Sequence, residues 1–158
     1  MRIMQMEEIT IEKLTEENFP VFTSLIEKLA VYEKLTPPGN DEKCRLQKDA
    51  FSENPKYEAY LAVVNGVPAG YITFYFTYST FLAKSTLYLE DLFVLEECRK
   101  KGIGRKLFDF CRSEAAKRGC GRMDWTVLTW NKPSIEFYEK SGAKRQDWYL
   151  YRFNEDKF

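Results

Sequence analysis

Histidine is absent from this chain of 158 residues, and its absence excludes every mechanism that uses an imidazole as the base. Proton transfer therefore has to use carboxylates, tyrosine, a thiol or water. The cysteines Cys44, Cys98, Cys111 and Cys120 lack the paired spacing of zinc ligands, and the commonest partner of cysteine in such sites is missing. We therefore expect free thiols and no metal site.

The chain also lacks net charge and long apolar runs. Its 24 basic residues balance its 24 acidic ones, so no overall field favours nucleic acid or a membrane surface. Residues 1–9 lack the apolar core of a signal peptide, and no apolar run is long enough to span a membrane. We expect a cytoplasmic protein without a nucleic-acid or membrane partner, which recognises charged ligands through local groups.

Apolar residues are plentiful enough for one packed core, since 44% of the chain is hydrophobic and 16% is aromatic. We expect a single domain over residues 1–158. Strands are predicted where apolar positions alternate, and helices where they recur every three to four residues. The predicted strands cover 9–14, 57–64, 67–78, 85–95 and 122–128, the predicted helices cover 21–34, 41–51, 102–118 and 133–140, and a last β-prone segment covers 148–153.

Turn and cap signals connect these elements. Thr15 and Asn40 are the predicted N-caps of the first two helices. The dipeptide Asn65-Gly66 predicts a tight hairpin. The succession strand, helix, strand over residues 87–128 predicts a βαβ unit whose strands are parallel. The expected fold class is mixed α/β, with a sheet that is antiparallel early and has a parallel pair late.

A basic turn before the longest predicted helix is the first candidate for a ligand site. Five of the eight residues from Arg99 to Lys106 are basic, although cations are disfavoured in the first turn of a helix. Gly102 and Gly104 let phosphate oxygens approach backbone N–H groups closely. The P-loop tripeptide is absent, and Leu107 stands where a dinucleotide fingerprint needs a third glycine. The turn is either an anion site of another kind or a solvated basic loop.

Three motifs occur in one order along the chain: LYLEDLFV at 87–94, RKKGIG at 99–104 and WNKPSIEFYEKSGA at 130–143. Together they resemble the GNAT acyl-CoA N-acetyltransferases, and within that superfamily the diamine (spermidine/spermine and thialysine) N-acetyltransferases. The resemblance covers nearly the whole chain. It implies the GNAT fold, in which helices flank a single twisted mixed sheet with its parallel pair around the acetyl-CoA site. It also implies acetyl-CoA as cosubstrate, no metal, and a homodimer.

The resemblance assigns two sets of residues to acetyl-CoA. The backbone of Phe93 and Val94 would bind the pantetheine arm and polarise the thioester carbonyl, which is compatible with core packing of both side chains. Asn131 and Ser134 would face the pantetheine, although Asn131 is equally suited to be only the N-cap of the next helix. The residues around the pyrophosphate would be Arg99, Lys101, Gly102, Ile103, Gly104 and Arg105.

For catalysis, the resemblance implies that Tyr138 is the general acid that protonates the departing CoA thiolate. The spacing of Tyr138 from Ile135 alone would favour a core aromatic. Glu90 would take part in acceptor binding and proton removal, through water. Because Glu90 and Asp91 are adjacent in an apolar strand, alternation predicts that they point to opposite faces and that at least one is enclosed. Paired structural carboxylates are the alternative.

On the acceptor side, the resemblance implies Tyr32, Glu33, Asp91 and Trp148 in addition to Glu90. Acidic and aromatic side chains suit an alkylammonium group through charge pairing and cation–π contact. Glu33 is also suited to be an ordinary solvated helix residue.

Two departures from the spermidine/spermine enzymes affect the expected substrate. Ser79-Thr80 stands where those enzymes carry an acidic residue and is closer to the thialysine-type branch, and Gln146-Asp147 replaces their paired glutamates. Both changes reduce the negative charge available to a long polycation. A lysine analogue or a small diamine therefore fits as well as spermidine.

We expect the primary amine of a small molecule to attack acetyl-CoA directly in a ternary complex. The alternatives are acetylation of a protein or peptide amine and a non-catalytic acyl-CoA-binding regulatory module. A covalent route through Cys98 is disfavoured because the chain has no histidine to activate the thiol.

Overall fold

The computed structural model describes residues 8–158. These residues form two compact units, of which the first ends at Trp125 and the second comprises Thr126–Phe158. The single domain expected over residues 1–158 remains a prediction.

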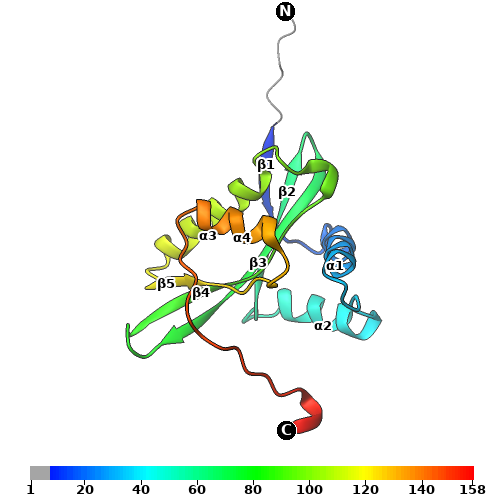
Figure 1. The fold of residues 1–158 in the computed structure, drawn as a ribbon. Coiled ribbons are helices and arrows are strands. Elements are labelled where there is room, and N and C mark those ends of the chain that lie inside the picture. The colour runs from blue at the N-terminus through cyan, green and yellow to red at the C-terminus, as the bar shows by residue number, and fades with distance from the viewer. Residues whose placement is uncertain (1–7) are drawn as a thin grey trace, which may run out of the picture. The chain divides into compact units, whose positions relative to one another are not determined.

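The first unit is built on one sheet with the strand order β1-β2-β3-β4-β5 (Figure 1). The first four strands pair antiparallel, and β5 runs parallel to β4. This arrangement confirms the predicted mixed sheet and its late parallel pair. The strands are β1 (Ile9–Lys13), β2 (Glu58–Val64), β3 (Val67–Ser79), β4 (Lys84–Val94) and β5 (Arg122–Asp124).

The β2–β3 connection is the hairpin that the sequence predicted. Asn65 and Gly66 have φ angles of 49° and 80°, and two consecutive positive φ values define the type I′ turn that matches the twist of the strands. Val64 pairs with Val67 directly behind the turn, so the turn sets the register of the two strands.

Helices cover both faces of this sheet. On one face, Phe22 of α1 (Phe19–Glu33) packs with Leu61 and Tyr71 in the main core cluster. On the other face, Phe110 of α3 (Ile103–Lys117) lies 4.6 Å from the ring of Tyr60. Adjacent strand residues point to opposite faces of a sheet. Leu61 therefore packs in the layer of α1, and Tyr60 packs in the layer of α3. The helix α2 (Asn40–Ala50) has no buried residue.

The caps of the first two helices differ from the prediction. Thr15 does not cap α1; it forms a closed turn in which its N–H donates to Asn18 Oδ1 at 2.8 Å and its Oγ1 accepts from the N–H of Asn18 at 3.3 Å. Asn18 is the N-cap. The N-cap of α2 is Gly39 rather than Asn40, because the Glu42 carboxylate reaches back to accept the N–H of Gly39 at 3.0 Å.

The second unit contains the helix α4 (Lys132–Lys140), which ends before Gly142 at a φ angle of 88°. Two sequence predictions were wrong near and within this unit. The strand predicted over 122–128 ends at Asp124, and no strand forms over 148–153. The latter residues have high β-propensity, but in the described part of the chain no neighbouring strand pairs with them, and propensity alone does not make a strand.

Among residues 8–158, no helix is long and apolar enough to cross a membrane.

Candidate active site

A β-bulge in β4 organises the first group of predicted site residues. Thr73 of β3 pairs with Asp91 and the next residue, Phe74, pairs with Leu89, so Glu90 is an extra residue on β4. The bulge interrupts the regular alternation from which Glu90 and Asp91 were predicted to point to opposite faces, and that arrangement remains a prediction. Glu90 is exposed and Asp91 is largely enclosed, which confirms that at least one of the two is withdrawn from solvent.

Thr73 contacts Asp91 through two hydrogen bonds. The hydroxyl of Thr73 donates to Oδ2 of Asp91 at 3.1 Å, and it accepts the backbone N–H of Asp91, also at 3.1 Å. Thr73 itself is buried. No local sequence signal marks Thr73, because its partner is 18 positions away and is brought opposite only by strand pairing.

Three carboxylates interact around the bulge. Burial, followed by the charge of Glu90, raises the pKa of Asp91 to about 6. The same two causes, in the same order, raise the pKa of Glu33 at the end of α1. The charge of Glu90 disfavours the ionised forms of Asp91 and Glu33, so a cation that enters the cluster is favoured, and Asp91 can accept a proton near pH 6.

Tyr71 lies beneath this cluster. Its ring is fully buried, and its hydroxyl oxygen has no hydrogen-bond partner among the described residues that satisfies ordinary geometry. Burial, followed by the charge of Asp91, raises the pKa of Tyr71 well above its usual value. Tyr71 therefore stays a neutral phenol and adds no further negative charge to the cluster.

Arg99 connects the end of α1 to the end of β4. Its guanidinium carbon lies 4.8 Å from the ring centroid of Tyr32 and 5.9 Å from that of Phe93. Its Nε donates to the carbonyl oxygen of Val94 at 3.0 Å. These contacts hold the aromatic ring of Tyr32 beside the strand end. The pyrophosphate role expected of Arg99 remains a prediction.

The glycine turn has the backbone of an anion site. Gly102 is the N-cap of α3 in the left-handed region, at a φ angle of 82°, and its neighbour-but-one Lys100 has a φ of 62°. The first N–H groups of α3 have no acceptors within the helix, and its first turn contains no acidic residue. A Cβ atom on Gly104 would lie 3.8 Å from Cγ2 of Val94, so the start of α3 lies against the end of β4.

The side chains around this turn are of two kinds, buried apolar groups and exposed charged groups. Ile103 is 1% exposed and Phe93 is 6% exposed, so both side chains belong to the core and only their backbones can face a ligand. Lys101 is exposed. Arg105 donates from Nε to Oδ2 of Asp109 at 3.0 Å, in a half-exposed pair. Such pairs contribute little, so a phosphate can compete for Arg105.

The other predicted site residues belong to the second unit. Asn131 is buried and caps α4, accepting the N–H of Ser134 on its Oδ1 at 3.4 Å. Tyr138 is half-buried, and its ring meets that of Phe137 edge-on at a centroid distance of 5.4 Å. Trp148 is 83% exposed. The cap role of Asn131 is confirmed, and the ligand roles of these residues remain predictions.

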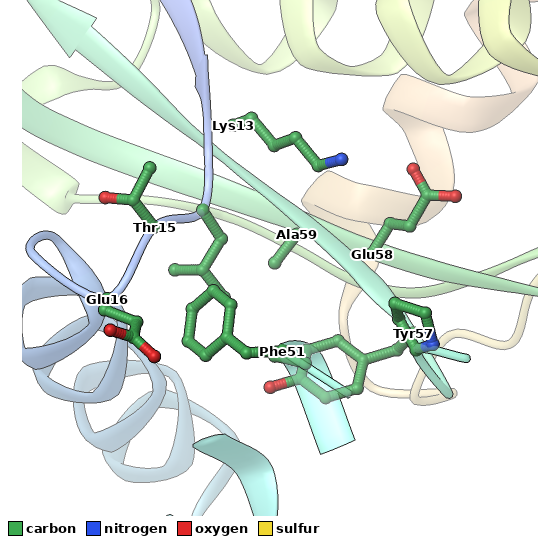
Figure 2. A pocket seen from close by; sticks show the side chains of 10 residues that line it. Lys13, Thr15, Glu16, Phe51, Tyr57, Glu58 and Ala59 are labelled. Carbon is green, nitrogen blue, oxygen red and sulfur yellow. The ribbon is translucent and has the colours of Figure 1, made fainter. Parts of the chain in front are cut away.

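A cavity of about 490 Å³ in the first unit is a separate feature (Figure 2). Lys13, Phe51, Tyr57 and Glu58 are among the residues that line it, and no predicted site residue does so. Two of its polar groups are paired within the protein: Tyr57 donates to the carbonyl oxygen of Leu46 at 2.8 Å, and Glu58 accepts from Arg118. Among residues 8–158, no cluster of three or more potential metal ligands occurs.

Comparison with known proteins bears on this site. The family model for the acetyltransferase (GNAT) family matches residues 22–143. The thialysine N-epsilon-acetyltransferase of Bos taurus is 34% identical over 141 residues, which cover 82% of each chain. The L-ornithine N5-acetyltransferase of Arabidopsis thaliana is 39% identical over 107 residues, covering 66% of this chain and 47% of that one.

Solved structures share the fold. A probable acetyltransferase superposes with a TM-score of 0.80 at 20% identity, covering 92% of this chain and 97% of that chain. An aminoglycoside N-acetyltransferase in complex with CoA gives a TM-score of 0.79 at 15% identity, covering 97% of this chain and 99% of that chain. At these identities the likeness shows the fold.

Proposed function

The chain belongs to the acetyltransferase (GNAT) family, and from that membership we propose that it transfers the acetyl group of acetyl-CoA to the primary amine of a small diamine, polyamine or lysine-like molecule. Acetyl transfer and the use of acetyl-CoA follow from the family. The acceptor is the new element, and the acidic cluster at the β4 bulge is the observation that supports it.

A small amine suits this cluster chemically. Such an amine is protonated in solution, with a pKa of about 10.4, and it must lose a proton before it can attack. Glu33, Glu90 and Asp91 supply negative charge for the ammonium group. The ring of Tyr32, which the guanidinium of Arg99 faces at 4.8 Å, would add a cation–π contact from the end of α1. The named thialysine and L-ornithine acetyltransferases act on amines of this size.

Acetyl-CoA would lie along the strand end and the glycine turn. The backbone of Phe93 and Val94 would bind the pantetheine arm, and Asn131 and Ser134 would face it from the α4 turn. The residues around the pyrophosphate would be Arg99, Lys101, Gly102, Ile103, Gly104 and Arg105. The left-handed N-cap and the acid-free first turn of α3 support this assignment.

The proposed reaction is a direct transfer in a ternary complex. Glu90 removes a proton from the ammonium group through water, and the neutral nitrogen forms a bond to the acetyl carbonyl carbon. The carbon–sulfur bond then breaks, and the thiolate takes the phenolic proton of Tyr138. The nitrogen loses its second proton to solvent, from which Tyr138 is reprotonated.

We also propose a homodimer, as the family resemblance implies. The aromatic side chains of Tyr149, Tyr151 and Phe153 are 88%, 88% and 77% exposed, and a surface of this kind favours association. Light scattering coupled to size-exclusion chromatography tests the mass in solution. A mass of one chain, about 18.7 kDa, contradicts this part of the proposal.

Thiol release from acetyl-CoA tests the proposed acceptor. The panel should contain thialysine, lysine, ornithine, small diamines, spermidine, spermine and a lysine peptide. Turnover that saturates with the short amines and is weaker with the peptide supports the proposal. Turnover with the peptide alone would move the function to protein acetylation.

A further inference from the structure

Thr73 is the residue at the acceptor cluster to which sequence and family resemblance assign no role. It is buried in the middle of β3, directly opposite Asp91 at the bulge. A threonine in a buried strand position usually packs by its methyl group. This threonine also makes two polar contacts, and both go to the same residue.

The two contacts have complementary directions. A β-bulge disrupts the ladder of backbone hydrogen bonds locally. At this bulge the backbone N–H of Asp91 is accepted by the Thr73 hydroxyl, which in turn donates to the Asp91 carboxylate. A hydroxyl can accept and donate at once, whereas an apolar side chain of the same shape can do neither.

We propose that Thr73 is a positioning residue of the acceptor site, which fixes the β4 bulge through Asp91 and thereby holds Glu90 toward Glu33. The effect of Thr73 on acetylation rests on the proposed function. The effect of Thr73 on the geometry and charge of the cluster is independent of that function.

The electrostatic surroundings of Asp91 indicate what Thr73 does for the charge of the site. The groups that face Asp91 are Glu33 of α1, Tyr71 of β3 and the adjacent Glu90 of β4. Burial and both glutamates oppose its ionisation, and the hydrogen bond from Thr73 favours it. Thr73 therefore preserves negative charge where an ammonium group would bind.

Three variants separate the hydroxyl from the packing of the side chain. Thr73→Val keeps the shape and removes both hydrogen bonds, and Thr73→Ser keeps the hydroxyl. Thr77→Val makes the same chemical change on the same strand at an exposed position, so it is the matched control. If Thr73→Val does not fold, Thr73→Ala replaces it, because alanine is smaller and also lacks the hydroxyl.

The first measurement uses NMR on the whole protein and needs no turnover. In Thr73→Val, or Thr73→Ala, hydrogen exchange of the Asp91 amide should become about tenfold faster, because its N–H loses its acceptor. The carboxyl titration of Asp91 should move to higher pH, because its carboxylate loses the hydrogen bond from Thr73. Thr73→Ser and Thr77→Val should resemble the wild type. If loss of the hydroxyl changes neither amide exchange nor titration, or if serine behaves as alanine does, the proposal is overturned.

The second measurement is kinetic. Thr73→Val should lower kcat/KM for the amine about tenfold and shift the acid limb of the pH profile upward, while the Kd for acetyl-CoA stays within about twofold. Equal kinetics for Thr73→Val and Thr77→Val would overturn the catalytic consequence. If the wild type acetylates no amine, the proposed function fails, and the NMR measurement still decides whether Thr73 fixes the bulge.

Discussion

Gly70 and Phe93 lie so close together across the β3–β4 pair that a Cβ atom on Gly70 would collide with the carbonyl oxygen of Phe93. The same atom would lie 3.1 Å from Cα of Val94. The backbone that is proposed to hold the pantetheine arm is therefore set by the absence of a side chain on the neighbouring strand.

Replacement of this glycine should move the strand end. Gly70→Ala should lower the free energy of unfolding by about 1–3 kcal/mol, since the backbone on both sides must shift to admit a methyl group. It should also weaken acetyl-CoA binding. Urea denaturation and calorimetric titration measure the two effects. If Gly70→Ala is as stable as the wild type, then β3 and β4 can move apart at this point without loss of free energy of unfolding.

Gly104 provides the matched comparison at the start of α3. A Cβ atom there meets only Val94 Cγ2, at 3.8 Å, so alanine fits the protein and should leave stability unchanged or raise it by up to about 1 kcal/mol. The added methyl group of Gly104→Ala would occupy space where the pyrophosphate is proposed to bind. Gly104→Ala should therefore weaken acetyl-CoA binding about tenfold. Unchanged affinity would remove the close-approach role of Gly104.

Much of the frame follows from local sequence signals, because the residues involved are neighbours. Short stretches of sequence predict the Asn65-Gly66 turn, the strand before the basic turn and the helix after it. The structure confirms all three. The bulge at Glu90 depends on how β4 pairs with β3, and strand pairing is a non-local property. The sequence therefore predicted neither the bulge nor the contact of Thr73 with Asp91.

Near the end of the chain, local sequence predicted β structure that does not form. Residues 148–153 are rich in aromatic side chains, which favour strands, yet they form none in the described structure. Strand formation needs a partner with unpaired N–H and C=O groups, and the sequence of a segment does not state whether it has one.

Tyr138 should act on chemistry rather than on binding. Tyr138→Phe keeps the ring and removes the phenolic proton, so kcat should fall about 100-fold while the Kd for acetyl-CoA stays within about twofold. Tyr78→Phe, on an exposed tyrosine of β3 that belongs to no proposed site, is the control and should have wild-type kinetics. Wild-type kcat in Tyr138→Phe across the pH range would exclude the general-acid role.

The raised pKa of Asp91 predicts a particular dependence of stability on pH. Burial and Glu90 raise the pKa to about 6, so between about pH 4 and pH 6 the native state keeps a proton that the unfolded state has released. Stability contributed at this site is therefore present below about pH 4 and is lost as the pH rises to about 6, by about 1–3 kcal/mol.

Asp91→Asn removes this titration and still offers an oxygen to the hydroxyl of Thr73. The difference in free energy of unfolding between the variant and the wild type should increase from pH 4 to pH 6 in favour of the variant, and then level off. Urea denaturation at pH 4, 5, 6 and 7 measures it. A difference that is constant over this range would show that Asp91 titrates as an ordinary exposed carboxyl group.

The most direct test of the acidic cluster as the acceptor site is the steady-state comparison of the wild type with Glu90→Gln on the best amine of the panel, with the Kd for acetyl-CoA measured alongside. In Glu90→Gln, kcat/KM for the amine should fall about 100-fold, because the exposed carboxylate that receives the proton is lost, while acetyl-CoA should bind within about twofold of wild type. Wild-type kcat/KM for the amine in Glu90→Gln would contradict the role of the cluster as the acceptor site.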